Sequence, residues 1–259
     1  DLKFNPGLDQ QEFERASSDA LRVYDPLEPW NRRVYHFNYR FDQWVFLPVV
    51  NGYRYVTPNL VQTGVHNFFS NLGEIPTLAN SLLQLKGQRA MNSTARLLFN
   101  TILGIGGIWD PATHMGLPRH SEDFGQTLGY YGVPAGPYLM LPFLGPSTFR
   151  DTGGMVADHF LKPTTYWADN SSRDWAEYSG LILAGTEAID TRSRNYKQLE
   201  DLQETSLDFY ATVRSLYRQQ REALIENRED ADQPAPMPSM SFDSLLDEDE
   251  SSEAVAVTE

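Results

Sequence analysis

Large apolar residues recur at steps of three and four along most of this chain, which is the spacing of one face of an α-helix. The strict alternation of apolar and polar residues that marks a half-buried strand dominates nowhere. We therefore expect an all-α fold built from amphipathic helices. The clearest stripes are Trp30, Val34, Phe37, Phe41 with Trp44 or Val45; Val61, Val65, Phe68 or Phe69 and Leu72; and Met91, Ala95, Leu98, Ile102 and Ile105.

Proline and glycine divide these stripes into separate predicted helices. We expect the first helix to finish by Pro48 and a new one to start at Thr57 and Pro58. Gly73 is predicted to end that second helix, and Pro76 lies in the first turn of the next.

The polar faces of these helices are mostly uncharged. Between Tyr55 and Trp109 the charged residues are Glu74, Lys86, Arg89 and Arg96, whereas amides and hydroxyls are frequent. Helices that face water usually carry Lys and Glu, because these side chains solvate well and pair along the helix. Neutral polar faces are expected where they line an enclosed wet space while the apolar face meets lipid or core.

A bent apolar segment lies at the centre of the chain. Residues 97–154 hold eleven of the 18 glycines and six of the 16 prolines, and residues 125–149 contain no ionisable Asp, Glu, Lys, Arg or His. Its length would allow a membrane span, but the glycines and prolines break the helical hydrogen bonding that a span requires. We expect a helical hairpin with a bent apolar tip, either buried in a soluble core or held at depth in one lipid leaflet.

The charge and composition divide the chain into three parts. Residues 229–259 hold ten of the 35 acidic residues and no Lys or Arg, so the remaining 25 acids face 21 bases. We expect a lead-in with a short polar helix over 1–24, a helical domain over 25–227 and an acidic disordered tail over 228–259. We find no apolar run of 18 or more residues, and we expect neither a leader nor a spanning anchor in this form of the chain, from which processing could have removed a leader. The acidic balance argues against a nucleic-acid partner.

The sequence shows no arrangement of residues that is typical of an enzyme active site or a metal site. The chain has no cysteine, no G-x-S-x-G elbow, and five histidines without metal-ligand spacing. We therefore expect neither an enzyme nor a bound metal or cofactor.

Four long motifs closely resemble the MlaA (VacJ) family of Gram-negative outer-membrane lipoproteins. They are DPLEPWNRRVYHFN at 25–38, FFSNLGEIPTLANSLLQLKG at 68–87, RLLFNTILGIGGIWDPAT at 96–113 and EDFGQTLGYYGVPAGPYLMLPFLGPSTFRDTGG at 122–154. The resemblance implies a helical ring in the periplasmic leaflet of the outer membrane, with an amphipathic channel. It also implies removal of phospholipids mislocalised to the outer leaflet, association with a trimeric porin, and transfer of the lipid to a soluble periplasmic carrier. Family members start with a lipidated cysteine, which this sequence lacks.

On this resemblance we expect helices from Trp30 to Ile105 to surround a polar-lined passage, and the tip from Leu128 to Gly145 to line or gate it. The expected hairpin residues are Leu128, Tyr131, Gly132, Gly136, Tyr138, Leu141 and Phe143. The expected channel-wall or membrane-facing residues are Trp30, Asn31, Phe37, Asn38, Phe41, Phe68, Phe69, Leu98, Ile102 and Trp109.

Two alternatives stay open. The chain could be a structural lipoprotein that docks its apolar surface on a porin and provides no lipid passage. A phospholipase would need a nucleophile, which the sequence does not display.

Overall fold

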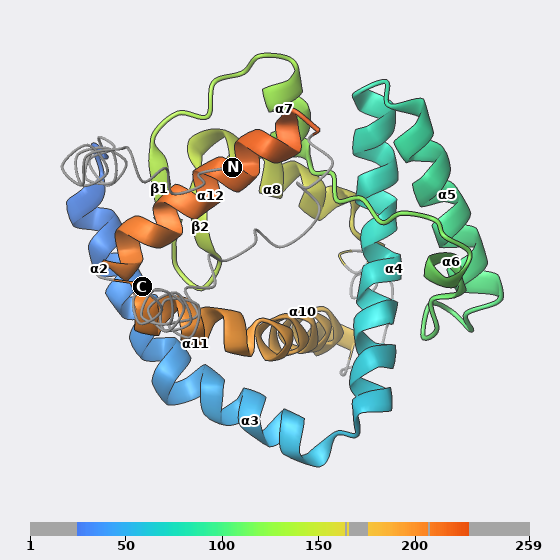
Figure 1. Cartoon of the computed structure of the whole chain (residues 1–259), viewed down its shortest axis with the longest axis horizontal. Helices are drawn as coiled ribbons and strands as arrows, with labels where there is room; N and C mark the ends of the chain where they lie inside the picture. The colour runs from blue at the N-terminus through green and yellow to red at the C-terminus, as the bar shows by residue number, and fades with distance from the viewer. Residues whose placement is uncertain (1–24, 164, 166–175, 207, 228–259) are drawn as a thin grey trace, which may run out of the picture.

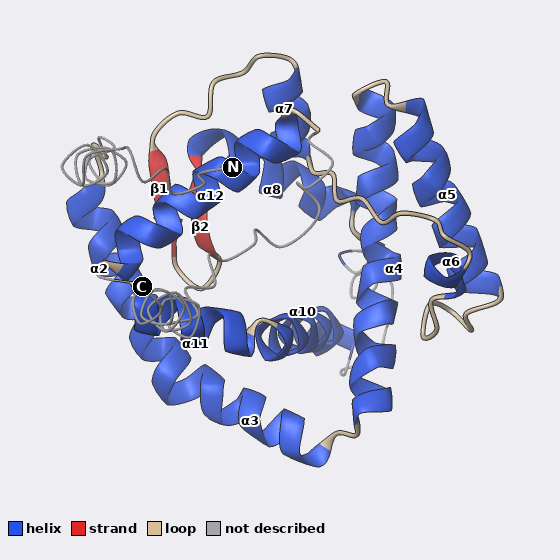
Figure 2. Cartoon of the chain, viewed as in Figure 1, coloured by secondary structure: helices blue, strands red, loops and turns tan. Residues whose placement is uncertain are grey.

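The computed structural model describes residues 25–163, 165, 176–206 and 208–227. The expected lead-in over 1–24 and the acidic tail over 228–259 lie outside this part of the chain. The described residues form a ring of helices with one small two-stranded sheet, as the sequence predicts for an all-α fold (Figures 1 and 2).

The first arc of the ring is a nearly continuous helical rod. It consists of α2 (Glu28–Phe41), a π-helical turn η1 (Asp42–Phe46) and α3 (Leu47–Val56) (Figure 1). Pro48 lies in the first turn of α3 and does not end the rod, contrary to the sequence expectation. A wide turn tolerates a residue without an N–H, and π-turns commonly mark such places within helices.

The long helix α4 (Asn59–Leu83) forms the opposite side of the ring, and α5 (Gly87–Ile102) packs along its outer side (Figure 1). The predicted break at Gly73 is wrong, because α4 runs without interruption through Pro76. A buried proline costs one backbone hydrogen bond. The packing of α4 along α5 supplies the compensating stability.

The central Gly/Pro segment is not a helical hairpin. After the short helix α6 (Pro111–His114) comes α7 (Phe124–Tyr130), and the tip itself folds as two antiparallel strands, β1 (Tyr138–Leu141) and β2 (Gly145–Thr148). Four prolines between 134 and 146 remove the N–H groups that a helix would need. A two-stranded hairpin tolerates Pro146 because one side of each strand has no neighbour to bond.

After α8 (Phe149–Leu161), the described residues form α10, α11 and α12, which complete the ring. Helix α10 (Ala176–Arg194) contacts α3 and α4 and lies inside the ring (Figure 1). Helix α11 (Tyr196–Thr205) leads to α12 (Phe209–Ile225), which packs on α7 and β2. Arg221 of α12 donates to Asp123 at 2.9 Å and to Asp151 at 2.8 Å, so one guanidinium ties α12 to the starts of α7 and α8.

The interior is unusually polar. The one compact apolar cluster among the described residues is small: Val34, Tyr138, Met140 and Tyr210, flanked by Tyr35 and Tyr217. Several of the neutral side chains that we expected to face a wet space are buried between helices instead, and the four amides among them hydrogen-bond to neighbouring elements. These buried side chains are Asn71, Asn80, Ser81, Gln84, Ser93 and Asn100. No described helix combines the length and the apolar character needed to cross a membrane.

Candidate functional site

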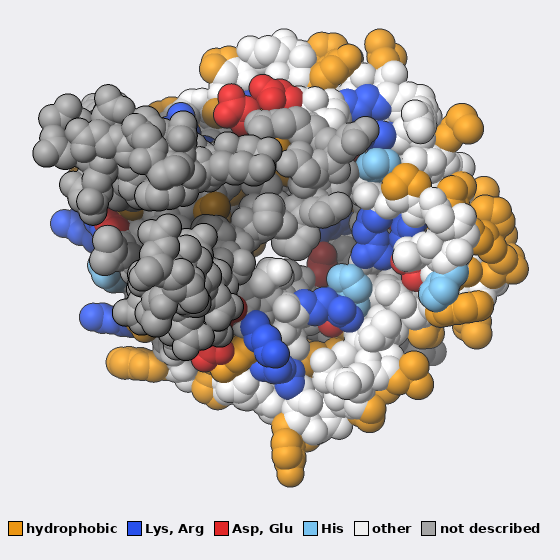
Figure 3. Space-filling model, in the orientation of Figure 1, with side chains coloured by type: hydrophobic (Ala, Val, Ile, Leu, Met, Phe, Trp, Pro, Cys, Tyr) orange, Lys and Arg blue, Asp and Glu red, His pale blue; other side chains and the backbone are white. Residues whose placement is uncertain are grey.

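The outer surface of the ring is apolar. Trp44 on η1 is 78% exposed, Leu60 on α4 is 84% exposed and Ile102 on α5 is 71% exposed. Figure 3 shows hydrophobic side chains gathered along the rim of the molecule, over α5 and α6 and along α3. Water-soluble monomers rarely expose so much contiguous apolar surface, which instead marks contact with lipid or with another protein.

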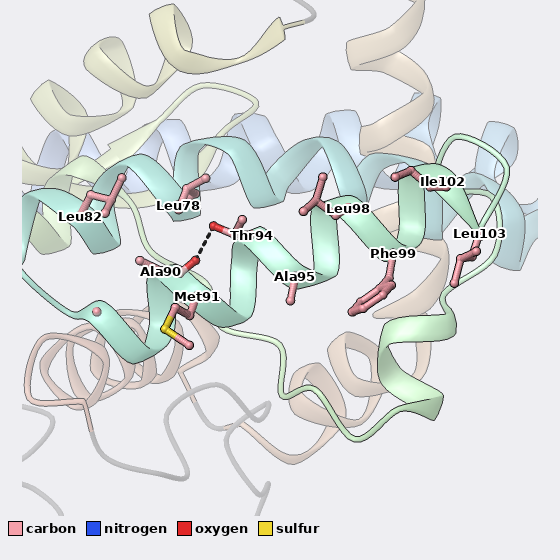
Figure 4. Close-up of a pocket in the computed structure, with 11 residues that line it drawn as sticks. Leu78, Leu82, Ala90, Met91, Thr94, Ala95, Leu98, Phe99, Ile102 and Leu103 are labelled. Carbon is pink, nitrogen blue, oxygen red and sulfur yellow. Dashed lines mark hydrogen bonds between the residues drawn. The ribbon is translucent and has the colours of Figure 1, made fainter.

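A groove runs between α4 and α5 on this outer side, with a volume of about 870 Å³ (Figure 4). Leu98 and Ile102, both predicted site residues, line it together with Leu78 and Leu82 of α4. Among the described residues that line it, Thr94 has the one polar side chain, and its hydroxyl donates to the Ala90 carbonyl at 2.8 Å. The groove therefore offers acyl chains or apolar side chains a surface without open hydrogen-bonding groups.

The opposite faces of α4 and α5 meet through a buried ion-pair network. Arg96 is fully buried and donates to Glu74 at 2.7 Å and to Asp110 at 2.9 Å. Burial opposes ionisation of Asp110, but hydrogen bonds from Thr113 and the charge of Arg96 outweigh it and hold the Asp110 pKa below its usual range. Glu74 and Arg96 are two of the four charges in the otherwise uncharged stretch from 55 to 109. The other two, Lys86 and Arg89, both pair with Glu122.

A polar stripe follows the face of α4 that turns towards α10. Gln62, His66 and Ser70 are four residues apart and so share this face. His66 Nδ1 lies 3.1 Å from Asp190 of α10, and Arg119 donates to Ser70 at 3.0 Å. Burial is the main reason that the pKa of His66 is lowered, which keeps the imidazole neutral near pH 7. Figure 3 shows Lys, Arg and His side chains gathered between α4 and α10 on the viewed face.

Two asparagines of α2 hold the β-hairpin. The Asn31 amide donates to the Tyr138 carbonyl at 3.0 Å, and its oxygen accepts the Met140 N–H at 2.8 Å. Two helical turns later Asn38 does the same for Leu141 and Phe143, at 2.9 Å each. Asn31 and Asn38 thus bond to the main chain from Tyr138 to Phe143 as a neighbouring strand would.

The tip of the hairpin carries an aromatic cluster. The Phe143 ring lies 5.2 Å from the ring of Phe37 and 4.9 Å from that of Phe41, edge to face in both cases. Phe143 has a φ of 64°, a strained conformation for a residue with a side chain, and is still 65% exposed. The structure therefore brings seven of the predicted residues together at one place: Asn31, Phe37, Asn38, Phe41, Tyr138, Leu141 and Phe143.

The other predicted hairpin residues lie at the end of α7 and in the loop that follows. Leu128 is half-buried, and the exposed Tyr131 donates its hydroxyl to the Leu83 carbonyl at the end of α4. Gly132 and Gly136 have φ values of 83° and 72°, which glycine adopts without strain. These residues connect the two β-strands to the α4 side of the ring.

Four predicted residues lie apart from the hairpin. Phe68 and Phe69 contact each other edge to face on α4. Trp30 at the start of α2 and Trp109 in the loop after α5 are both more than half exposed. Trp30 and Trp109 therefore belong to the exposed apolar surface.

The sequence analysis missed the ion-pair network and the polar stripe, although one signal was present. An isolated Glu74 and an isolated Arg96 within otherwise uncharged helices indicate a buried pair, because neither charge has a solvated face to occupy. Asp190 and Arg119 are far from α4 in sequence and carried no comparable signal.

These features define a class of protein: a helical ring that buries polar groups between its helices and exposes large apolar groups on its outer surface. The chain belongs to the MlaA lipoprotein family, whose sequence model matches residues 23–224. This confirms the resemblance found in the four motifs.

Relatives and a solved structure agree with that assignment. The chain is 36% identical over 239 residues to the Escherichia coli intermembrane phospholipid transport system lipoprotein MlaA, covering 90% of this chain and 91% of that protein. It is 33% identical over 199 residues to the Haemophilus influenzae protein of the same description, covering 75% and 76%. A solved structure described as the structural basis for maintenance of bacterial outer membrane lipid asymmetry matches with a TM-score of 0.66 at 34% identity, covering 78% of this chain and all of that one.

Proposed function

We propose that this protein removes phospholipids mislocalised to the outer leaflet of the outer membrane and passes them towards the periplasm. The observation that carries the proposal is the inverted distribution of side chains, polar between the helices and apolar outside. The relatives in Escherichia coli and Haemophilus influenzae are described as components of an intermembrane phospholipid transport system.

The physical difficulty of this task is desolvation of the acyl chains. Drawing a two-chain phospholipid into water exposes about 30 methylenes at ~0.8 kcal/mol each, roughly 20 kcal/mol in total. A protein seated in the periplasmic leaflet lowers that barrier when its outer surface replaces lipid contacts and its inner face accepts the headgroup. The exposed side chains of α3, α4 and α5 provide the first of these, and the stripe of Gln62, His66 and Ser70 provides the second.

In this proposal the headgroup moves along the inner face of α4, and the tip from Leu128 to Gly145 lines or gates the path. The clasp by Asn31 and Asn38 and the strained, exposed Phe143 support such a role, because they fix an apolar tip at a set position on α2. A trimeric porin beside the ring and a soluble periplasmic phospholipid carrier that takes the lipid complete the proposal, with a lipid anchor in the full-length protein.

The gate is tested by a matched pair of glycine variants. Gly132 and Gly116 both have φ near 80° and open space where a side chain would start, but only Gly132 lies at the tip. In cells lacking the native protein, Gly132→Arg should raise the phospholipid exposed at the cell surface several-fold, measured by labelling with a non-permeant amine reagent. Gly116→Arg should restore asymmetry as the native chain does. Equal restoration by both folded variants would count against the gate.

A second candidate is a structural lipoprotein that docks on a porin, and the apolar α4–α5 groove is the feature that favours it. This candidate predicts that Leu98→Asp in the groove abolishes function while Gly132→Arg has no effect. The lipid-passage proposal predicts loss of asymmetry from Gly132→Arg with porin binding intact.

Seating in a leaflet is tested by fluorescence. A variant that keeps Trp44 and replaces the other four tryptophans by Phe should be quenched strongly by lipids brominated along their chains, because Trp44 lies on the outer surface. Emission that brominated lipids leave unchanged would contradict the seating.

A further inference from the structure

We propose that the corner between α3 and α4 binds the phosphate group of an anionic lipid headgroup. The inference rests on the proposed function and names the lipid chemistry that the protein would select. A polar cavity of about 580 Å³ lies at this corner, where α3 ends, α4 begins and the last turn of α10 packs against both. That volume is within the usual range for small-molecule sites.

The lining of this cavity is suited to a phosphate. Two guanidinium groups, from Arg54 and Arg194, contribute to it. Neutral residues complete it: Asn51, Tyr55, Asn59, Gln62, Thr63 and Ser193. None of the described residues that line the cavity is an Asp or Glu. Arginine presents a planar fork of donors that matches phosphate oxygens, and amides and hydroxyls can satisfy the remaining lone pairs.

Arg54 supplies the unbalanced positive charge. Its guanidinium lies 4.5 Å from the centre of the Tyr196 ring and has no carboxylate partner within the described part of the chain. The two neighbouring arginines differ. Arg192 donates twice to Asp42, at 2.9 Å each, and Arg194 pairs with Asp190 at 3.3 Å. The aromatic ring therefore orients Arg54 without neutralising it.

The cavity opens next to the apolar surface. Tyr55, Val56 and Leu60 at the same corner are among the most exposed apolar side chains of the described residues. If these three side chains contact the acyl chains of a leaflet, Arg54 and Arg194 lie at the depth of the lipid headgroups. Figure 3 shows Lys and Arg side chains gathered between α10 and α3 on the viewed face.

The absence of an acid in the lining predicts selectivity among lipids. The ammonium of a zwitterionic headgroup such as phosphatidylethanolamine finds no carboxylate partner, whereas phosphatidylglycerol leaves its charge on the phosphate alone. General attraction of the protein to anionic membranes is not expected, because outside the acidic tail 25 acids face 21 bases. A preference for phosphatidylglycerol would thus report on the local site.

The experiment compares binding of the full chain to phosphatidylcholine vesicles containing 30% phosphatidylglycerol or 30% phosphatidylethanolamine. One well-placed arginine is worth about 1 kcal/mol at such a surface, so we expect about fivefold tighter binding to phosphatidylglycerol. Arg54→Gln should remove that preference and Arg54→Lys should keep part of it. Arg218→Gln, on the exposed face of α12, changes the net charge equally and should keep all of it.

The outcomes separate this inference from the function on which it rests. Failure to bind either vesicle would overturn the leaflet seating itself. Binding to both without preference, or a preference that survives Arg54→Gln, would overturn the headgroup site alone. Loss of the preference on adding 10 mM inorganic phosphate, but not chloride at equal ionic strength, would assign the cavity to a free phosphate instead of a lipid.

Discussion

Helices α5 and α12 are almost equal in length, with 16 and 17 residues, yet they distribute their side chains in opposite ways. Helix α12 buries Tyr210, Ala211 and Leu224 with one charged residue, Arg214, and exposes Arg218, Gln219 and Gln220, as a helix at a water-facing surface does. Helix α5 buries Ser93, Arg96 and Asn100 and exposes Met91, Leu98 and Ile102. The two helices lie on opposite sides of the ring (Figure 1).

The contrast indicates two different surroundings for one molecule. Exposed apolar residues on α5 cost free energy in water, and the polar groups beneath them gain strength from the low dielectric of an apolar environment. The outer side of α4 and α5, which we call the arm, is therefore suited to lipid. The side formed by β1, β2 and α12, which we call the closing side, is suited to water. The predictions below compare variants on the two sides or test one of the sides by itself.

The largest expected effect is loss of the buried charge on the arm. Arg96→Met leaves the buried Glu74 without its cation and leaves Asp110 with Arg119 alone, which costs about 3 to 5 kcal/mol of unfolding free energy. Arg218→Met on α12 removes an exposed arginine and should change stability little. Chemical denaturation in detergent micelles measures both. Similar small losses in the two variants would mean that the network contributes little to the arm.

The next effect concerns membrane affinity without a change in folding. Ile102→Glu places a carboxylate on the exposed face of α5, where transfer into lipid costs about 2.5 to 3.5 kcal/mol for a charge at depth. We expect vesicle binding to weaken by tenfold or more, while the melting temperature in detergent stays the same. Gln220→Glu adds the same charge to α12 and should leave vesicle binding unchanged. Equal weakening in the two variants would remove the distinction between the sides.

Sequence reasoning predicted the helices, because their apolar spacing is regular and long. It did not predict how far they run. Pro48 and Gly73 were expected to end helices, but a π-turn before Pro48 and the packing of α4 along α5 keep both helices intact. Local signals of this kind are weaker than tertiary packing.

The candidate site could be predicted where its residues lie close together in one sequence motif. Asn31, Phe37 and Asn38 come from a single stretch of α2 and meet the hairpin that sequence reasoning had also singled out. The strand conformation of that hairpin was missed, because its apolar residues do not alternate and its prolines only exclude a helix. The contacts of Arg54 with Tyr196 and of His66 with Asp190 could not be predicted, since nothing local records a contact across so long a stretch of chain.

A smaller effect on unfolding free energy is expected on the closing side, from the hydrogen bonds by which Asn31 and Asn38 hold the β-hairpin. Asn31→Ala removes the partners of the buried Met140 N–H and Tyr138 carbonyl, which costs about 2 to 4 kcal/mol. Asn38→Ala removes the equivalent bonds at the exposed tip, where water can replace them, and should cost about 1 kcal/mol. Amide hydrogen exchange separates the two, with faster exchange at Met140 in the first variant and at Phe143 in the second. Unchanged exchange at both amides would mean that the hairpin does not depend on α2.

The smallest effect comes from glycines with the same backbone conformation on the two sides. Gly132→Ala, at the tip, adds a methyl group to open space, so the cost is about 1 kcal/mol for a positive φ in a residue with a side chain. Gly107→Ala bears the same strain, but its methyl group would lie 2.7 Å from the Asn71 Cβ, so α4 must move and the loss should be clearly larger. Denaturation of both variants in detergent gives the comparison. If Gly107→Ala loses no more unfolding free energy than Gly132→Ala, the arm can shift to make room for the methyl group. Tight packing of the arm would then no longer explain why its polar groups stay buried beneath an apolar surface.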